Sequence, residues 1–275
     1  MVNNKLIEQN LDAWSQSPFD KETISKALKL KDNNNEDFND SFYTDLSFGT
    51  GGMRGIVGVG PNRVNKYTFG RNTQGISNYI NKHSNNKPES VVIAYDCRND
   101  SEYLAKQVAG IFSANNIKVY LFNSIRPTPE LSYAVVKLNC ICGIVLTASH
   151  NPPEYNGYKV YWKDGGQIVP PIDTNLIKEI NSTDYSEINF KRNESLIKII
   201  GAEIDDQFIK DSILNGKIGN SNREDYKIVF TPLHGTSYKI LPEVLKGAGY
   251  TNLHIVKEQE IPDGNFPTVK SPNPE

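Results

Sequence analysis

Residues 91–147 alternate between short apolar runs and amphipathic stretches, and this order constrains the fold more than any other feature of the sequence. The runs at 91–95, 118–122 and 142–147 are short and rich in β-branched residues, as buried strands are. The stretches at 100–116 and 127–138 place apolar residues at helical spacing. Parallel strands need crossover connections, which are usually helices. We therefore predict a three-layer α/β/α domain with a mainly parallel, mixed sheet.

The ends of these two helices are also predicted. Asp100 or Ser101 is expected to cap the first helix, because both side chains accept hydrogen bonds from free backbone N–H groups. Thr128 is expected to cap the second, with Pro129 at its first helical position, where the missing N–H group costs nothing.

The remaining sequence suggests three parts. Residues 1–44 are expected to form a helical N-terminal arm with a polar loop at 31–40, and residues 45–200 the α/β domain I. Residues 201–275 repeat the alternation of strands and helices and are expected to form an incomplete second domain of the same type. This second domain is predicted from four segments: helices at 203–216 and up to 247, and strands at 226–231 and 253–256.

Composition excludes several classes of function. A net charge of −2 gives no basic surface for nucleic acid. The polar first ten residues lack the apolar core of a signal peptide, and no run of about 18 apolar residues could span a membrane. Cys97, Cys140 and Cys142 are odd in number, which argues against a disulfide framework, and no His/Cys cluster has zinc-ligand spacing. We therefore expect a cytoplasmic protein with no nucleic-acid or membrane partner, in which Cys140 and Cys142 are small buried hydrophobes.

Three loops are expected to meet at the carboxyl edge of the sheet, where ligands bind in such folds. They are 96–99, 123–127 and 148–157. The third contains Ser149 within "TASHNPPEYNG", and a rigid loop can present a serine hydroxyl as a nucleophile or offer backbone N–H groups to an anion. The alternative is an ordinary turn built by Ser and Asn. Lys159, on the strand that follows, would favour phosphate near Ser149.

Other segments leave two interpretations open. The first is "FGTGGMRGIVGVGPNRVN" (48–65), whose glycines could let the backbone approach phosphate closely, with Arg54 or Arg63 binding it. The segment lacks the Gly-Lys-Ser/Thr of a Walker A loop. It could equally be a surface hairpin. Asp96 and Arg98 are expected to form a surface ion pair, and a lone His234 is more often structural.

The motifs together resemble those of one enzyme family. "TASHNPPEYNGYKVYW" is similar to the phosphoserine loop of the α-D-phosphohexomutase superfamily, which contains the phosphoglucomutases and phosphomannomutases. "FGTGGMRG", "YDCRNDS", "PTPEL" and "PDGNFPTVKSPNPE" resemble that family in the same order over about 45–275. The glycine-rich segment is most similar to the phosphoglucomutase-2-like branch, and the chain resembles the amino-terminal portion of such enzymes.

The resemblance implies roles for individual residues. Ser149 matches the serine that carries the transferable phosphoryl group, and Arg54 matches the arginine that faces it. His150 and Lys159 match residues of the reacting centre, with Lys159 a candidate for proton transfer. The implied reaction interconverts hexose 1-phosphate and hexose 6-phosphate through a phosphoserine enzyme and a sugar bisphosphate, with pentose phosphate as an alternative substrate.

The family also implies Mg²⁺, bound between the serine phosphate and three aspartates of an Asp-x-Asp-x-Asp-Arg loop. The sequence has no such pattern, so Ser149, through its phosphate, is the metal ligand expected here, and the aspartates would lie beyond 275. We therefore expect the 275 residues alone to be inactive. The alternative is a non-catalytic module that binds phosphosugar or phosphate.

Overall fold

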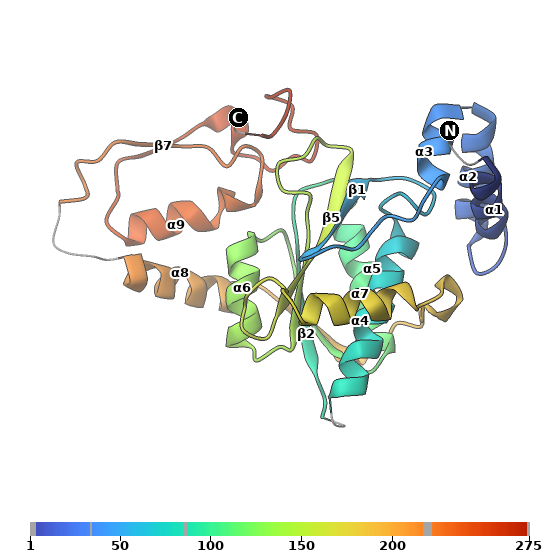
Figure 1. The fold of residues 1–275 in the computed structure, drawn as a ribbon. Helices are drawn as coiled ribbons and strands as arrows, with labels where there is room; N and C mark the ends of the chain where they lie inside the picture. The colour runs from blue at the N-terminus through green and yellow to red at the C-terminus, as the bar shows by residue number, and fades with distance from the viewer. Residues whose placement is uncertain (1–3, 34, 85–86, 217–221, 274–275) are drawn as a thin grey trace.

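In the computed structural model, the chain forms a six-stranded sheet with helices on both faces, followed by a smaller α/β unit (Figure 1). The structure describes residues 4–33, 35–84, 87–216 and 222–273. The sheet has the strand order β1-β5-β4-β2-β3-β6, and only β5 runs antiparallel to its neighbours. The predicted three-layer α/β/α domain with a mainly parallel, mixed sheet is confirmed.

The six strands are β1 (Gly52–Ile56), β2 (Ser90–Tyr95), β3 (Lys118–Phe122), β4 (Cys142–Leu146), β5 (Tyr155–Trp162) and β6 (Ile197–Ile200). The helices of this domain are α4 (Lys66–His83), α5 (Ser101–Ala114), α6 (Thr128–Lys137) and α7 (Ile172–Asn181).

The two faces of the sheet have separate cores, because side chains alternate along each strand. Val91, Ile93 and Ile144 point toward α4, α5 and α7 and join the larger core. Val92 and Val145 point the other way and pack against α6, where Cys140 is also buried. Among the described residues all cysteines are free, and Cys140 and Cys142 are buried in these two cores as expected.

The predicted starts of α5 and α6 need small corrections. Asp100 is the N-cap of α5, but its side chain makes no capping hydrogen bond. α6 begins at Thr128, one residue earlier than predicted, so Pro127 is the N-cap residue. The backbone of Pro127 is extended, and no side chain caps the first turn of α6.

The N-terminal segment forms three helices: α1 (Asn4–Trp14), α2 (Lys21–Asn33) and α3 (Asn35–Phe42). The polar loop predicted at 31–40 is wrong, because α3 occupies most of it and buries Phe38 and Phe42. These helices pack on the large domain through an aromatic cluster in which Trp14 stacks on Phe19, with ring centroids 4.2 Å apart, and meets Tyr67 of α4 edge-on.

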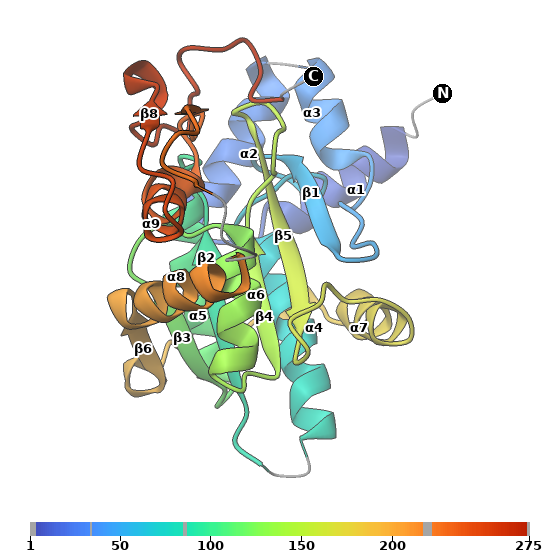
Figure 2. The same ribbon diagram turned by 90° about the vertical axis from the view of Figure 1, so that its left-hand side faces the viewer.

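The second unit contains β7 (Ile228–Phe230), α9 (Ile240–Gly247) and β8 (Leu253–Ile255), and α8 (Ala202–Gly216) leads into it. β7 and β8 pair in parallel, as the repeated alternation of strands and helices predicted. Figure 1 shows this unit and the N-terminal helices on opposite sides of the sheet, and Figure 2 shows α8 and α9 lying side by side. Within the described ranges, no helix is both long enough and apolar enough to cross a bilayer.

Candidate functional site

The loop between β4 and β5 presents a serine at the carboxyl edge of the sheet. We call residues 147–157, which are this loop and the first three residues of β5, the serine loop. Ser149 is exposed and has a φ of 58°, a left-handed conformation that is uncommon outside glycine. Its N–H donates to Thr147 Oγ1 at 2.9 Å, which holds the backbone in this conformation. The serine hydroxyl is therefore turned outward at the tip of an ordered loop.

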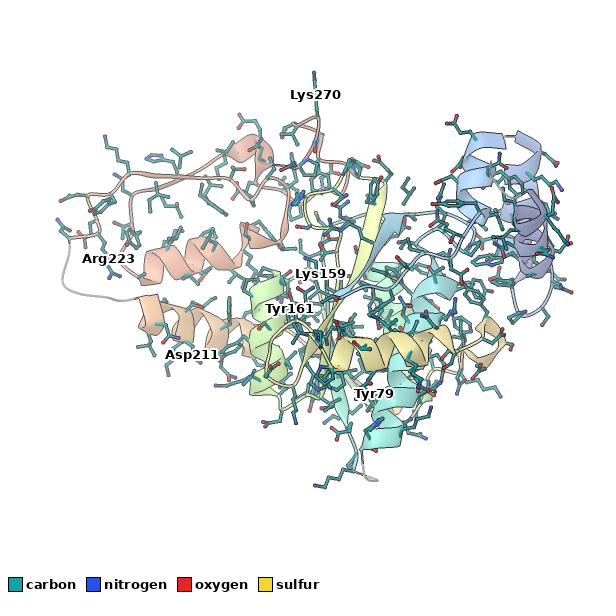
Figure 3. All side chains as sticks on the ribbon, viewed as in Figure 1. Tyr79, Lys159, Tyr161, Asp211, Arg223 and Lys270 are labelled. Carbon is teal, nitrogen blue, oxygen red and sulfur yellow. The ribbon has the colours of Figure 1, made fainter. Side chains whose placement is uncertain are left out.

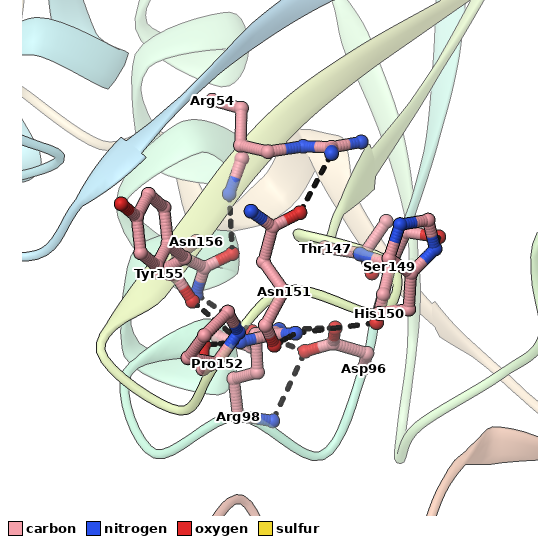
Figure 4. Close-up of polar contacts among 12 residues, drawn as sticks. Arg54, Asp96, Arg98, Thr147, Ser149, His150, Asn151, Pro152, Tyr155 and Asn156 are labelled. Carbon is pink, nitrogen blue, oxygen red and sulfur yellow. Dashed lines mark hydrogen bonds and ion pairs between the residues drawn. The ribbon is translucent and has the colours of Figure 1, made fainter. Parts of the chain in front are cut away.

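Arg98 holds the serine loop from beneath. Its guanidinium donates to four carbonyl oxygens of the loop, as Figure 4 shows. The four acceptors, with their distances, are Pro152 (2.7 Å), Tyr155 (2.7 Å), Ser149 (3.2 Å) and Asn151 (2.7 Å). Its Nε lies 3.2 Å from Asp96 Oδ2 as an ion pair rather than a hydrogen bond.

The surface ion pair predicted for Asp96 and Arg98 is therefore wrong in one respect. The pair forms, but the Arg98 side chain is only 1% exposed. A buried guanidinium must have its donors satisfied. The serine loop supplies four backbone carbonyls as acceptors, and the guanidinium in turn joins these parts of the loop. Residue spacing gave no signal for this role, since the four acceptors are backbone atoms and lie more than 50 positions away along the chain.

Strand register brings Arg54 and Lys159 to one face of the sheet. In the antiparallel β1–β5 pair, Arg54 lies opposite Gly157 and Lys159 lies opposite Gly52. Directly opposed residues point to the same face, so both cations lie on the side covered by α6. Gly157 is required here, because a Cβ at this position would lie 2.5 Å from the carbonyl oxygen of Thr147.

Arg54 reaches the serine loop directly. It is exposed, and its Nη1 donates to Asn151 Oδ1 at 2.6 Å (Figure 4). Asn151 was not predicted to matter, although its side chain joins Arg54 to the loop that carries Ser149. The arginine of the glycine-rich segment is thus placed two residues from the serine along the loop, as an anion-binding group would be.

Lys159 is half-buried and has a free ammonium group. Within the described part of the chain it makes no hydrogen bond or ion pair. Burial, and then the charge of Arg54, lower the pKa of Lys159 below its usual range. Figure 3 shows Lys159 and Tyr161 together on the side of β5 toward α6, which agrees with the alternation of the strand.

The other predicted site residues divide between the site and the scaffold. His150 is exposed next to Ser149, and its Nδ1 lies 3.4 Å from the serine Oγ. Arg63 is buried and ion-paired with Asp37 and Asp40, both at 2.7 Å, so it supports the N-terminal helices and is not part of the site. The segment 48–65 is not a surface hairpin, because β1 within it forms the edge of the sheet.

The carboxylates of the described residues do not by themselves form a metal site. No group of three or more His, Cys, Asp or Glu side chains in these ranges is arranged to hold an ion. Asp96, which pairs with Arg98 next to the serine loop, accepts hydrogen bonds from the Ser101 hydroxyl and the Arg98 N–H. The residues present therefore offer Mg²⁺ no site of their own.

Comparison with known proteins agrees with this arrangement. Residues 45–187 match the family "Phosphoglucomutase/phosphomannomutase, alpha/beta/alpha domain I", and residues 206–275 match its alpha/beta/alpha domain II. A phosphoglucomutase of Staphylococcus aureus (strain bovine RF122) is 39% identical over 240 residues, which cover 86% of this chain and 43% of the relative. A phosphoglucomutase of Staphylococcus haemolyticus is 41% identical over 238 residues, which cover 85% and 43%. The chain thus spans less than half the length of these relatives.

Solved structures show the same fold. A phosphoglucomutase/phosphomannomutase family protein of Burkholderia thailandensis superposes with a TM-score of 0.62 at 22% identity, over 82% of this chain and 46% of that one. The open form of parafusin, a phosphoglucomutase of Paramecium, superposes with a TM-score of 0.60 at 19% identity, over 85% and 46%.

Proposed function

Because the chain belongs to the phosphoglucomutase/phosphomannomutase family, we propose that it is the phosphoserine-bearing part of a phosphosugar mutase. The proposed reaction interconverts hexose 1-phosphate and hexose 6-phosphate. The observation that carries the proposal is the outward-turned hydroxyl of Ser149, on a loop held by Arg98 and contacted by Arg54. A phosphoryl donor needs this combination of an accessible oxygen, a fixed backbone and nearby positive charge.

The proposed chemistry has two transfers. In the first, the bond between phosphorus and the Ser149 oxygen breaks, and a new bond forms to the free hydroxyl of the sugar monophosphate. The hydroxyl proton leaves, the serine oxygen regains a proton, and the sugar becomes a bisphosphate. In the second transfer the other phosphate of the bisphosphate returns to Ser149. Phosphate monoesters react extremely slowly without help, so position and charge supply most of the catalysis.

The basic residues of the site are proposed to divide this work. Arg54 would face the equatorial oxygens of the phosphoryl group, because a guanidinium can bind two of them at once. Lys159 would transfer protons, since its lowered pKa makes release of a proton easier than for an exposed lysine. His150 would lie beside the reacting serine.

The proposal includes Mg²⁺, with the phosphate of Ser149 as the ligand that this chain contributes. The ion would neutralise charge on the transferring group. The proposal also places the protein in the cytoplasm. Hexose phosphates are favoured over pentose phosphates as substrates because the matched relatives are named phosphoglucomutases. Coupled assays with glucose 1-phosphate, mannose 1-phosphate and ribose 1-phosphate in parallel would rank the three.

A first prediction tests Ser149 as the phosphoryl carrier. After incubation with a hexose bisphosphate, intact-mass analysis should find one added phosphoryl group, and Ser149→Ala should abolish it because no other hydroxyl occupies the tip of the loop. Ser25→Ala, at an exposed position of α2, is the matched control and should leave the added mass unchanged. Undiminished mutase activity in Ser149→Ala would refute the proposal.

A further inference from the structure

A turn of the second unit lies against the loop that contains Arg98. This turn, Asp263–Phe266, is called the docking turn below. It is closed by a hydrogen bond from Phe266 N–H to the carbonyl of Asp263 at 3.2 Å, and the N–H of Asn265 donates to Asp263 Oδ1 at 2.8 Å. In Figures 1 and 2 the red segment that contains it passes over the end of the β4–β5 connection.

The contact between the docking turn and residues 97–99 is close. A Cβ on Gly264 would lie 2.7 Å from the carbonyl oxygen of Cys97 and 2.8 Å from the amide nitrogen of Asn99. Only glycine therefore allows the two backbones to approach this far. The side chain of Asn99 adds a hydrogen bond to Asn265 Oδ1 at 3.0 Å.

Phe266 extends this contact to Arg98 itself. The ring is 5% exposed, and the guanidinium carbon of Arg98 lies 5.4 Å from its centroid, within the range of a cation–π interaction. Phe266 has a φ of 49°, which a bulky residue adopts only when the surrounding structure holds it there. Arg98 is thus enclosed between the ring and the carbonyls of the serine loop.

His234 fastens the docking turn to the body of the second unit. It is 3% exposed, and its ring contacts the carbonyl of Ile261 at 2.9 Å and Thr268 Oγ1 at 3.0 Å, on either side of the turn. Its own carbonyl accepts from Asp263 N–H at 3.1 Å. The structural interpretation of His234 is therefore supported, and the structure it supports is the docking turn.

We propose that the docking turn positions the serine loop by holding Arg98 against it, so that the backbone around Ser149 depends on the second unit. The inference deepens the proposed function and rests on it for its catalytic meaning. Gly264 and Phe266 touch neither Ser149 nor its hydroxyl, so they are positioning residues that act through Arg98.

Hydrogen exchange tests the coupling directly. In Gly264→Ala the new methyl group must separate the turn from Cys97, and amide exchange in 148–156 should rise about tenfold. Phe266→Leu, which keeps an apolar side chain but removes the ring, should raise exchange in the same segment. Gly216→Ala is the matched control, because a Cβ there meets nothing within 4 Å. It should leave amide exchange unchanged both in 148–156 and in the docking-turn segment 263–269. Amides of β2 and β3 should stay protected in all three variants.

Each other outcome overturns the inference. If exchange rises in 263–269 but not in 148–156, the turn moves without the serine loop. If β2 and β3 lose protection equally, the effect is global and not positional. If Gly264→Ala does not fold, the amide exchange of 148–156 and 263–269 in Phe266→Leu decides the question.

A kinetic measurement connects the coupling to the proposed reaction. The measurement uses the longest form of the protein that contains these 275 residues. In Gly264→Ala, phosphorylation of Ser149 by a hexose bisphosphate should be on the order of a hundredfold slower. The bisphosphate concentration that gives half the maximal rate should change little. If Ser149 of the unsubstituted protein takes up no phosphoryl group, the proposed function fails, while the exchange data still decide the coupling.

Discussion

At the scale of single residues, Glu130 has the least expected environment. Its side chain is fully buried on α6, and no donor in the described ranges hydrogen-bonds to either carboxyl oxygen. Arg126 lies 3.6 Å away, but its guanidinium is bound to Asp205 at 2.7 and 3.0 Å. Burial, and then the neighbouring Asp205, raise the pKa of Glu130 to about 8. The residue is therefore protonated at neutral pH.

Because the pKa of Glu130 is raised in the folded state, the free energy of unfolding depends on pH in a direction that can be predicted. The unfolded chain releases the proton near 4.5 and the folded chain near 8, so between these values the folded state binds more protons. The free energy of unfolding should then fall with rising pH by up to about 1.4 kcal/mol per pH unit. Glu130→Gln, which resembles the protonated acid, should remove the slope and stabilise most at pH 8. Urea titrations from pH 4 to 9 measure this. The exposed Glu224→Gln is the control, and an unchanged slope in Glu130→Gln would contradict the argument.

At the scale of elements, the start of α4 is held by Asn65, the N-cap residue just before Lys66. Asn65 Oδ1 accepts from the N–H groups of Tyr67 and Thr68 at 3.0 Å, and its Nδ2 donates to the carbonyls of Gly58 and Gly60 at 3.0 Å. Asn65→Ala should cost about 1 kcal/mol for the lost cap, and more for the lost hydrogen bonds to the carbonyls of Gly58 and Gly60. Asn65→Asp keeps the cap, and its negative charge favours the helix N-terminus, but it replaces the amide donor to Gly58 and Gly60 with an oxygen. Its denaturation midpoint should lie between those of Asn65→Ala and the unsubstituted protein, and equal midpoints for the two variants would show that the cap contributes nothing.

The elements also show what sequence can and cannot predict. β2 to β4, α5 and α6 were predicted because their apolar periodicity is simple and their ends carry turn chemistry. α4 was not predicted, because polar side chains occupy its buried positions. Thr73 and Ser77 satisfy their hydroxyls with carbonyls four residues earlier, which hides the helix from a hydrophobic pattern.

For the candidate site, the sequence pointed to only some of the residues that the structure brings together. Ser149 stands in a distinctive loop, and Arg54 and Lys159 stand in recognisable segments on the paired strands beside it, so the sequence could point to all three. The role of Arg98 could not be predicted, since its hydrogen bonds go to backbone carbonyls far along the chain. The docking turn could not be predicted either, because its contact depends on how the second unit lies on the first.

At the scale of the whole molecule, Arg126 joins the two units a second time. It leaves the β3–α6 loop and binds Asp205 of α8 in a bidentate, buried pair, which Lys239 completes at 2.9 Å. Arg126→Met should cost about 3–5 kcal/mol, because it leaves a buried carboxylate short of its main partner. Chemical denaturation measures the loss, and limited proteolysis should cut first in α8.

The control for this prediction is an ion pair at the surface. Arg192 pairs with Glu194 at 2.7 Å, and the two side chains are 35% and 73% exposed. Arg192→Met should change the free energy of unfolding by about 1 kcal/mol or less. Similar losses in the two variants would mean that the Arg126–Asp205 pair does not join the units.

The antiparallel pairing of β1 with β5 sets a rule for length changes. Adding one residue inside either strand would invert every position beyond it, sending Arg54 into the packed interior and Met53 outward. Two added residues would restore the alternation but carry the guanidinium one pleat away from Asn151. The number of residues must therefore stay fixed within β1 and within the part of β5 that pairs with it, from Tyr155 to Lys159.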